Sequence, residues 1–392
     1  MKKPLIIFTI NFSLLPLWIL PGYTQMEMNN SISISFTTPV FQSDQEDYEF
    51  FRIPSLLSDG HRLYAFSEGR KNSVSDNGQI DIVLKISVDR GKTWGSLIRV
   101  TGFNGQSCQN PTPVYIKEEK KILLLFTKRT DATDTEDKIR NGTSKGYVGA
   151  YITESPDQGI TWSLVKEVTD QVKLNPWRWY AFGPGGAITL NKTNTHKGRI
   201  IVPANHSIEG GSGNEYLGAH VIYSDDLGKS WRIGAVDSEG MGSVNPNEMT
   251  VLETNSGTLY FNARSQNYQT DPLGNRAITY SRDGGITFVR KFFHEPQLVT
   301  PVVHASLARW EDKILFIAPS NPHERKNLSL WISCDETLTW SAPLLLHPGW
   351  AAYSNSVNLE KKMMGILYET GMDNPYQEIR FMIIDPGIKS TR

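Results

Sequence analysis

The apolar residues of this chain gather in short runs of six to eight residues that are rich in β-branched and aromatic side chains. Clusters of Gly, Asn, Asp or Ser bound the runs, and this combination is typical of β-strands. The clearest runs are LYAFSEG (63–69), IDIVLKIS (80–87), KILLLFTK (121–128), GYVGAYIT (146–153), RIIVPANH (199–206), AHVIYS (219–224), TLYFNARS (258–265) and KILFIAPS (313–320). No long amphipathic helical stretch lies between them, so the pattern predicts an all-β protein.

One eight-residue phrase occurs five times between these runs. The copies are SVDRGKTW from position 87, SPDQGITW from 155, SDDLGKSW from 224, SRDGGITF from 281 and SCDETLTW from 333. Its Ser and Asp side chains can bond nearby backbone N–H groups, its Gly supplies a positive φ, and its last aromatic residue can pack beneath the turn. Because one active site cannot use five equivalent copies, we interpret the phrase as a structural turn. The fifth copy has Thr337 in place of the Gly.

The spacing of the phrases indicates the architecture. Successive copies start 52 to 69 residues apart, and repeats of this length are typical of solenoids, propellers or arrays. Several strands per repeat without a helix favour propeller blades of four strands each.

The N-terminus has the pattern of an export signal. Lys2 and Lys3 precede an uncharged apolar run at 5–20, and PGYTQ follows it. The run is shorter than the ~20 residues that a membrane-spanning helix needs. We therefore expect a signal peptide over residues 1–25, with a retained anchor as the alternative.

Composition narrows the class of protein further. The 392 residues include 40 basic and 41 acidic side chains, which gives no reason to expect nucleic acid or an anionic membrane as a partner. Cys108 and Cys334 lie far apart in the sequence, and we expect two buried thiols and no disulfide. Export with few cysteines fits a secreted, periplasmic or cell-envelope bacterial protein.

The phrase S-x-D-x-G-x-T-W resembles the Asp box of sialidases (neuraminidases), and FRIP at 51–54 resembles their second signature. Asp boxes alone recur in unrelated β proteins, but FRIP followed by several boxes is a specific combination. The resemblance implies a six-bladed β-propeller of four-stranded antiparallel blades, with residues 26–392 as the catalytic domain. It implies sialylated glycans as partners and neither a metal nor an organic cofactor. We expect a monomer without a membrane-spanning partner.

Sialic acid carries a carboxylate on its anomeric carbon, and arginine binds a carboxylate with two parallel hydrogen bonds. Sialidases use three arginines from different blades. The resemblance assigns this role to Arg52 in FRIP, Arg264 in YFNARS and Arg325 in SNPHERKNLSLWIS, with Arg309 as the competitor of Arg325. It also implies that Glu369 in LYET steadies the first arginine.

The same carboxylate accounts for a tyrosine nucleophile, which sialidases use as an exception among glycosidases. Two like charges about 4 Å apart cost roughly 4 kcal/mol at an effective dielectric near 20, and a neutral phenol avoids this repulsion. The resemblance assigns the nucleophile to Tyr353 in GWAAYSNSV and its base to Glu248 in NPNEMTVLE, with Glu253 as the competing base.

A further carboxyl group must protonate the leaving sugar and later activate water. EGRKNSVSDNGQIDIV offers Asp76 in a loop flanked by Ser and Asn, and Asp81 at the start of an expected strand. The sialidase acid/base lies on such a loop, so we expect Asp76 to take this role. Arg70 is expected to line the same pocket.

The rest of the substrate needs apolar walls and hydrogen bonds. Asn110 in CQNPTPVY, the aromatic segment 177–186 and the polar segment 205–216 lie at plausible places. The expected activity is that of a retaining exo-α-sialidase. A trans-sialidase, including an intramolecular one, and a sialoglycan-binding propeller without activity are the alternatives. The presence of Asp76, Glu248 and Tyr353 together favours the enzyme.

Overall fold

The computed structural model describes residues 32–192, 195–208, 217–237, 244–266 and 275–387. These residues form β-sheets that are antiparallel except for one parallel pairing, with only three short helical segments, which confirms the all-β prediction. The helical segments are α1 (Glu136–Arg140), α2 (Thr169–Val172) and the 3-10 helix η1 (Glu360–Lys362). The predicted signal peptide lies outside the described residues. No helix in the described ranges has the length and hydrophobicity needed to cross a membrane.

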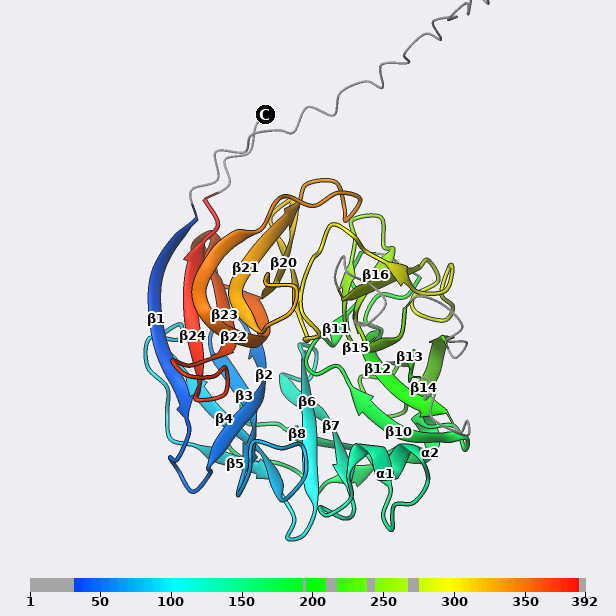
Figure 1. Cartoon of the computed structure of the whole chain (residues 1–392). Coiled ribbons are helices and arrows are strands. Elements are labelled where there is room, and N and C mark those ends of the chain that lie inside the picture. Colours follow the sequence, from blue (N-terminus) through cyan, green and yellow to red (C-terminus); the bar gives the residue numbers. More distant parts are fainter. Residues whose placement is uncertain (1–31, 193–194, 209–216, 238–243, 267–274, 388–392) are drawn as a thin grey trace, which may run out of the picture.

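The strands form sets of four that follow one another along the chain (Figure 1). The first set contains β2 (Phe50–Ser58), β3 (Leu63–Arg70), β4 (Ile80–Ser87) and β5 (Ile98–Thr101). The second contains β6 (Ser107–Ile116), β7 (Lys121–Arg129), β8 (Val148–Ser155) and β9 (Lys166–Glu167). The third contains β10 (Trp177–Phe182), β12 (Ile200–Ile208), β13 (Leu217–Ser224) and β14 (Arg232–Asp237), with β11 (Ile188–Thr189) paired to β12.

The fourth set contains β15 (Pro246–Glu253), β16 (Leu259–Ser265), β17 (Arg276–Ser281) and β18 (Phe293–His294). The next contains β19 (Ser306–Trp310), β20 (Lys313–Pro319), β21 (Lys326–Ser333) and the first part of β22 (Leu344–Asn358). The second part of β22 begins the last set, with β23 (Met364–Thr370) and β24 (Glu378–Asp385). The first described strand, β1 (Ser33–Gln42), completes this last set by pairing with β24.

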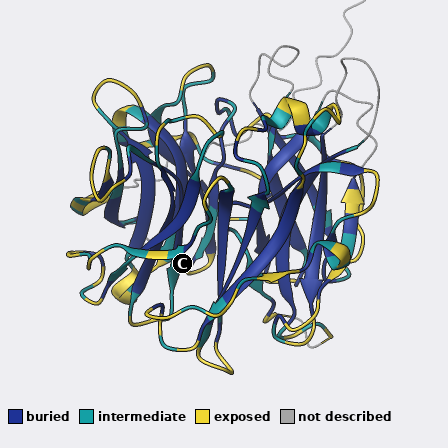
Figure 2. Cartoon of the chain, turned by 90° about the horizontal axis from the view of Figure 1, so that it is seen from below, coloured by how far each residue is buried: buried dark blue, intermediate teal, exposed yellow. Residues whose placement is uncertain are grey.

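Alternating side chains make a shared core between neighbouring sets. On β7, Leu123 and Leu125 join a buried cluster with the third set, whereas Leu124 and Phe126 join one with the first set. This is the two-residue period of a strand that is buried on both faces. Similar clusters join every other pair of consecutive sets, and Phe51 with Phe381 joins the last set to the first. Figure 2 shows buried strands and exposed connecting loops.

The two cysteines carry free thiols, so the absence of a bridge is confirmed. Cys108 is buried, but the expectation that both thiols are buried is wrong, because Cys334 is exposed. It occupies the second position of the repeated phrase. Val88 occupies the same position in the first copy and is 73% exposed, so this position of the turn faces solvent.

The repeated phrase is the turn between the third and fourth strands of a set. Its Ser is the last residue of the third strand in all five copies, namely Ser87, Ser155, Ser224, Ser281 and Ser333. In the fourth copy, the Ser281 hydroxyl donates to Asp283 Oδ1 (2.8 Å) and accepts from Gly285 N–H (3.0 Å). Asp283 also accepts from the N–H of Thr287 (2.9 Å) and from its hydroxyl. The same bonds recur in the other copies.

The fifth copy keeps this geometry without a glycine. Thr337 has a φ of 77°, close to the 86° of Gly285 in the fourth copy. Its N–H donates to Ser333 Oγ at 2.9 Å, as the glycine N–H groups do. A β-branched residue is disfavoured at positive φ, so the hydrogen bonds and packing of this turn outweigh its local strain.

We predict that Asp283→Ala lowers the free energy of unfolding by about 1–2 kcal/mol, because several donors lose their acceptor. Burial raises the pKa of Asp283, but hydrogen bonds from Thr287 outweigh it, and the folded pKa is lowered. A lowered folded pKa contributes stability above the unfolded value of about 4 and loses it as the pH falls further. In urea unfolding, the difference between wild type and variant should therefore be full near about pH 6 and shrink toward about pH 3.

Arg282→Ala is the matched control, because Arg282 is exposed in the same turn. It should leave stability and its pH dependence unchanged. Both variants should keep the catalytic constants of the wild type. A loss of turnover in Asp283→Ala without a change in stability would place the phrase in the active site and contradict the structural interpretation.

Candidate active site

A cavity opens where the first strands of the sets converge. Its lining includes Arg52 and Ile53 from β2, Gln109 and Asn110 from β6, Trp179 and Ala181 from β10, Asn247 and Glu248 from β15 and Tyr353 from β22. Arg264, Gln266, Arg325, Asp76, Glu68, Glu136 and Asn205 complete it. The cavity therefore collects polar side chains from parts of the chain that are far apart in sequence.

The first strands carry an irregularity in their pairing at the cavity. The register shifts between Arg52 and Ser55 in β2, and between Ala351 and Ser354 in β22. Corresponding shifts bracket Asn110 in β6, Trp179 in β10 and Glu248 in β15. A β-bulge bends a strand and re-aims its side chains, so these irregularities turn polar residues into the cavity while the rest of each strand stays regular.

Tyr353 and Glu248 form a short hydrogen-bonded pair in the cavity. The Tyr353 Oη lies 2.6 Å and 2.8 Å from the two carboxylate oxygens of Glu248. Arg264 Nη1 donates to both partners, at 2.7 Å to Tyr353 Oη and 2.8 Å to Glu248 Oε2. Burial and the Glu248 carboxylate raise the pKa of Tyr353 more than the nearby arginines lower it. The phenol is therefore protonated at neutral pH and donates its proton toward Glu248.

Glu369 is fully buried and ties Arg52 to the Tyr353 segment. Its carboxylate accepts from Arg52 Nε (3.1 Å) and Nη2 (3.3 Å). It also accepts from the backbone N–H groups of Ile53 (2.8 Å) and Tyr353 (3.2 Å). Four donors on one carboxylate leave little freedom, so Glu369 fixes both the guanidinium and the backbone that carries the tyrosine.

Arg325 reaches the cavity without an acidic partner among the described residues. Its guanidinium donates to Tyr376 Oη and to the Val302 carbonyl, both at 3.0 Å. Its competitor in the sequence, Arg309, does not line this cavity and instead makes a bidentate ion pair with Glu336 at 2.8 Å and 2.9 Å. Arg325 therefore brings a positive charge to the cavity that no carboxylate of the described chain neutralises.

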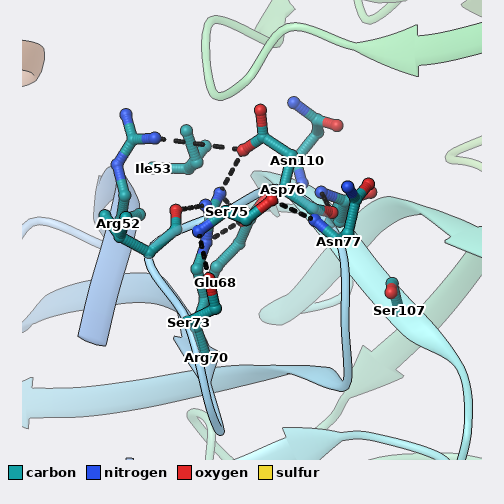
Figure 3. A network of polar contacts seen from close by, with 12 residues as sticks. Arg52, Ile53, Glu68, Arg70, Ser73, Ser75, Asp76, Asn77, Ser107 and Asn110 are labelled. Carbon is teal, nitrogen blue, oxygen red and sulfur yellow. Dashed lines mark hydrogen bonds and ion pairs between the residues drawn. The ribbon is translucent and has the colours of Figure 1, made fainter. Parts of the chain in front are cut away.

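Asp76 lies on the loop between β3 and β4, with its side chain 58% exposed. Figure 3 shows its carboxylate between the guanidinium groups of Arg70 and Arg52. Arg70 Nη2 donates to it at 2.7 Å, and Arg52 Nη1 lies 3.9 Å away. Its surroundings would raise the pKa of Asp76 by desolvation, but Arg70 and Arg52 outweigh this and lower that pKa to about 2.

The competing acids lie elsewhere. Asp81 is fully buried and accepts from Tyr48 Oη at 2.8 Å, with Arg99 at 3.1 Å. Glu253 accepts from the backbone N–H groups of Asn191 (2.8 Å) and Lys192 (3.0 Å) and lines a different cavity. Both carboxylates are engaged in structural contacts away from the Tyr353 pair.

Arg70, expected at the pocket, is not among the residues that line the cavity. Its side chain is 1% exposed and lies behind the cavity, because it is held by Glu68 (2.6 Å) and Asp76. Asn110 does line the cavity, with its amide oxygen 3.2 Å from the Thr127 hydroxyl. Of the aromatic segment, Trp179 lines the cavity, whereas Trp177 stacks on His206 with ring centroids 3.8 Å apart.

Two carboxylates at the cavity were not found from the sequence. Glu68 on β3 accepts from Arg70 and from the Asn110 N–H (2.9 Å), and burial raises its pKa. Glu136 on α1 pairs with Arg140, and burial raises its pKa as well. For Glu68 a signal existed, since it lies two residues before Arg70 on one face of a predicted strand. Glu136 follows no such pattern.

Comparisons with known proteins identify the family of this chain. The model of the BNR repeat-like domain family matches residues 61–366. Sialidase-2 of Cricetulus griseus is 27% identical over 389 residues, covering 88% of this chain and 96% of its own. A sialidase of Bacteroides fragilis is 25% identical over 368 residues, covering 88% of this chain and 64% of its own.

Solved structures share the fold. The Hadza microbial sialidase Hz136 has a TM-score of 0.75 and 23% identity, over 89% of this chain and 68% of its own. The intramolecular trans-sialidase from Ruminococcus gnavus has a TM-score of 0.72 and 18% identity, over 91% and 99%. Fold and site together define a glycoside hydrolase of the sialidase type. The chain belongs to the BNR repeat-like domain family, within the sialidases, as the Asp boxes and FRIP predicted.

We predict that Glu369→Gln destabilises the protein by about 3 kcal/mol or more, because one partner of a buried ion pair is removed. The amide of Gln also points N–H donors at the donors of Arg52, so the guanidinium is no longer held in place. Substrate binding should therefore weaken and KM should rise. Urea unfolding and steady-state kinetics measure the two effects. Glu378→Gln is the control. Glu378 and Arg380 form a more exposed ion pair on β24, the strand next to that of Glu369, and its loss should cost less than about 1 kcal/mol. Equal behaviour of the two variants would contradict the role of Glu369.

Proposed function

We propose that this protein is a retaining exo-α-sialidase, which hydrolyses terminal sialic acid from glycoproteins, glycolipids and oligosaccharides. The observation that carries the proposal is the Tyr353–Glu248 pair, 2.6 Å apart at its shortest, inside a cavity that Arg52, Arg264 and Arg325 also line. A phenol bonded to a carboxylate and surrounded by cations suits attack on an anionic sugar. A glycan-binding module has no need of this pair.

The three arginines are placed to take the substrate carboxylate. Arg52 bonds Glu369 through Nε and Nη2, which leaves Nη1 without a hydrogen bond to the described residues. Arg325 faces the cavity without a carboxylate partner in the described chain. In the proposed complex Arg52 Nη1 and the Arg325 guanidinium hold the carboxylate, so the anomeric carbon faces Tyr353.

Tyr353 is the proposed nucleophile. As its oxygen forms a bond to the anomeric carbon, its proton moves to Glu248 and the bond to the leaving sugar breaks. Arg264 stabilises the negative charge that the pair shares as it moves from Glu248 toward the Tyr353 oxygen, since Nη1 contacts both. In the second step water breaks the bond between the sugar and Tyr353, and Glu248 returns the proton to the phenol. Two displacements retain the configuration of the sugar.

Asp76 is the proposed acid in the first step and base in the second. With a pKa of about 2 it is ionised in the free protein at neutral pH, although the first step needs its proton. The substrate carboxylate resolves this conflict, because it neutralises the Arg52 charge that now favours the ionised form of Asp76. Substrate binding thus raises the pKa of the acid that the reaction needs.

The finer architecture belongs to the same proposal. The sets of four strands would be six blades of a closed propeller, supported by the β1–β24 pairing and by the core shared between the last and first sets. Residues 26–392 would form the catalytic domain of an exported protein, monomeric and carrying no cofactor.

We predict that Tyr353→Phe loses at least about 1000-fold in kcat on an aryl sialoside, while melting temperature changes little, because only the nucleophilic oxygen is removed. In the wild type, a fluorinated sialic acid that slows the second step should label Tyr353. Peptide mass mapping locates the label. Label on Glu248 would sink the tyrosine mechanism. NMR of the first product should show retained configuration, and product mass separates free sialic acid from an anhydro or transferred product.

A second prediction concerns the leaving group. In Asp76→Asn, a sialoside with a sugar leaving group should lose about 100-fold or more in kcat/KM. An aryl sialoside should lose far less in kcat/KM, because its phenol departs without a proton. Tyr353→Phe should show no such rescue. Equal loss on both substrates in Asp76→Asn would remove Asp76 from the role of acid.

A further inference from the structure

Arg129, the last residue of β7, is a buried cation that the proposed mechanism does not use. Its side chain is 1% exposed, and no ion pair joins it to a carboxylate among the described residues. Its Nε and Nη2 have no hydrogen-bond partner in the part of the chain that the structure describes. Burying a guanidinium without a counter-ion lowers the stability of the fold. Its position beside the Asp76 loop therefore indicates a role other than stability.

The one nitrogen that does donate holds the Asp76 loop. Arg129 Nη1 donates to Asn77 Oδ1 (3.1 Å), on the residue next to Asp76, and to the Asp134 carbonyl (2.8 Å). Arg129 thus joins the loop between β3 and β4 to the segment that leads into α1. A second tie runs in parallel, since Gly78 N–H donates to the Ala132 carbonyl at 2.9 Å.

The cross-strand neighbour of Arg129 holds the same loop. Ser107 pairs with Arg129 in the β6–β7 ladder, and its hydroxyl donates to the Gly78 carbonyl. Gln109, two residues further along β6, donates to the Asp76 carbonyl at 3.2 Å. Figure 3 shows Asn77 and Ser107 close to the Asp76 loop. The backbone on both sides of Asp76 is therefore fixed by the end of β7 and the start of β6.

The positive charge of Arg129 also acts on Asp76, in addition to the hydrogen bonds that hold the loop. Asp76 is contacted by Arg70 and Arg52, and Glu68 and Glu136 add negative charge nearby. Arg129 also lowers the pKa of Asp76 from a distance, without touching its carboxylate. Arg129 makes no ion pair with a described carboxylate, and Asp76, Glu68 and Glu136 all feel its charge from a distance.

We propose that Arg129 is a positioning residue for Asp76, which fixes the loop from behind and adds a permanent positive charge beneath its carboxylate. The inference rests on the proposed role of Asp76 as acid and base. It assigns a function in the reaction to a residue that lies outside the cavity.

Two variants test the proposal in the full chain. Arg129→Met removes the bonds and the charge, and Arg129→Lys replaces the guanidinium that makes both bonds while it keeps a charge. At the pH optimum of each variant, kcat/KM for sialyllactose should fall about 10- to 100-fold in Arg129→Met. For an aryl sialoside it should fall less than about threefold, since the first step then needs no acid. KM for the aryl sialoside should stay unchanged.

The pH profile gives a readout that a purely structural role would not move. The limb of the pH profile of kcat/KM that reports Asp76 is identified as the limb that Asp76→Asn abolishes. It should move to higher pH in Arg129→Met, because a cation that favours the ionised form has been removed. It should move less in Arg129→Lys. Lys128→Met is the matched control, since it removes a cation at the adjacent position and should change neither the limb nor the leaving-group dependence.

Asn77→Ala keeps the proposal testable if Arg129→Met does not fold. It removes the acceptor on the loop but leaves the charge, so it should show the same dependence on the leaving group with the pH limb in place. Equal losses on both substrates, or none, in Arg129→Met and Asn77→Ala would overturn the proposal. If Asp76→Asn itself loses both substrates equally, the proposed role of Asp76 fails, which is a different result.

Discussion

The buried carboxylate of Glu369 is the contact on which the rest of the site depends. It holds the Arg52 side chain and the backbone of Ile53 and Tyr353, although Arg52 and Glu369 are 317 residues apart in sequence. This contact requires the last set of strands to lie against the first. The packing of Phe41 on Phe51, with ring centroids 5.1 Å apart, and the pairing of β1 with β24 provide that. The geometry of the site is thus set by how the first and last sets of strands pack on each other.

The site is built where the sheets are least regular. Each of five first strands interrupts its ladder at a cavity residue, as at Tyr353 in β22 and Glu248 in β15. A regular strand would alternate its side chains between two packed faces and offer few of them to the cavity. Stability therefore comes from elsewhere, namely from the clusters between sets and from the repeated turns that join the third and fourth strands in five of the sets. Because the turns are separate from the site, their sequence can change, as at Thr337, without altering the site.

The sequence predicted those features whose cause is local. The repeated turns are closed by bonds within eight residues, so their role could be derived from the phrase itself. The resemblance added Arg52, Arg264, Arg325, Glu248 and Tyr353, which the fold brings to one cavity. The β-bulges, the position of Glu136 and the buried Arg129 depend on contacts between distant strands, and no local pattern encodes them. The prediction that Cys334 is buried is wrong, because the residue lies in a repeated turn, and the phrase itself indicates that turn.

Charge links recognition to chemistry in the proposed mechanism. Asp76 is kept ionised by Arg70 and Arg52, and Arg70 already shares its charge with Glu68. Arg52 shares its charge with Glu369 in the same way, but it lines the cavity and Arg70 does not, so a bound carboxylate changes the effect of Arg52 on Asp76 most. A neutral sugar in the same cavity adds no negative charge to that of Glu369 beside Arg52, so Asp76 stays without a proton. Such a sugar binds more weakly, because it offers no carboxylate to the arginines. It also reacts more slowly, because Asp76 stays ionised and cannot protonate the leaving group. In this mechanism the carboxylate of the substrate therefore contributes to catalysis as well as to binding.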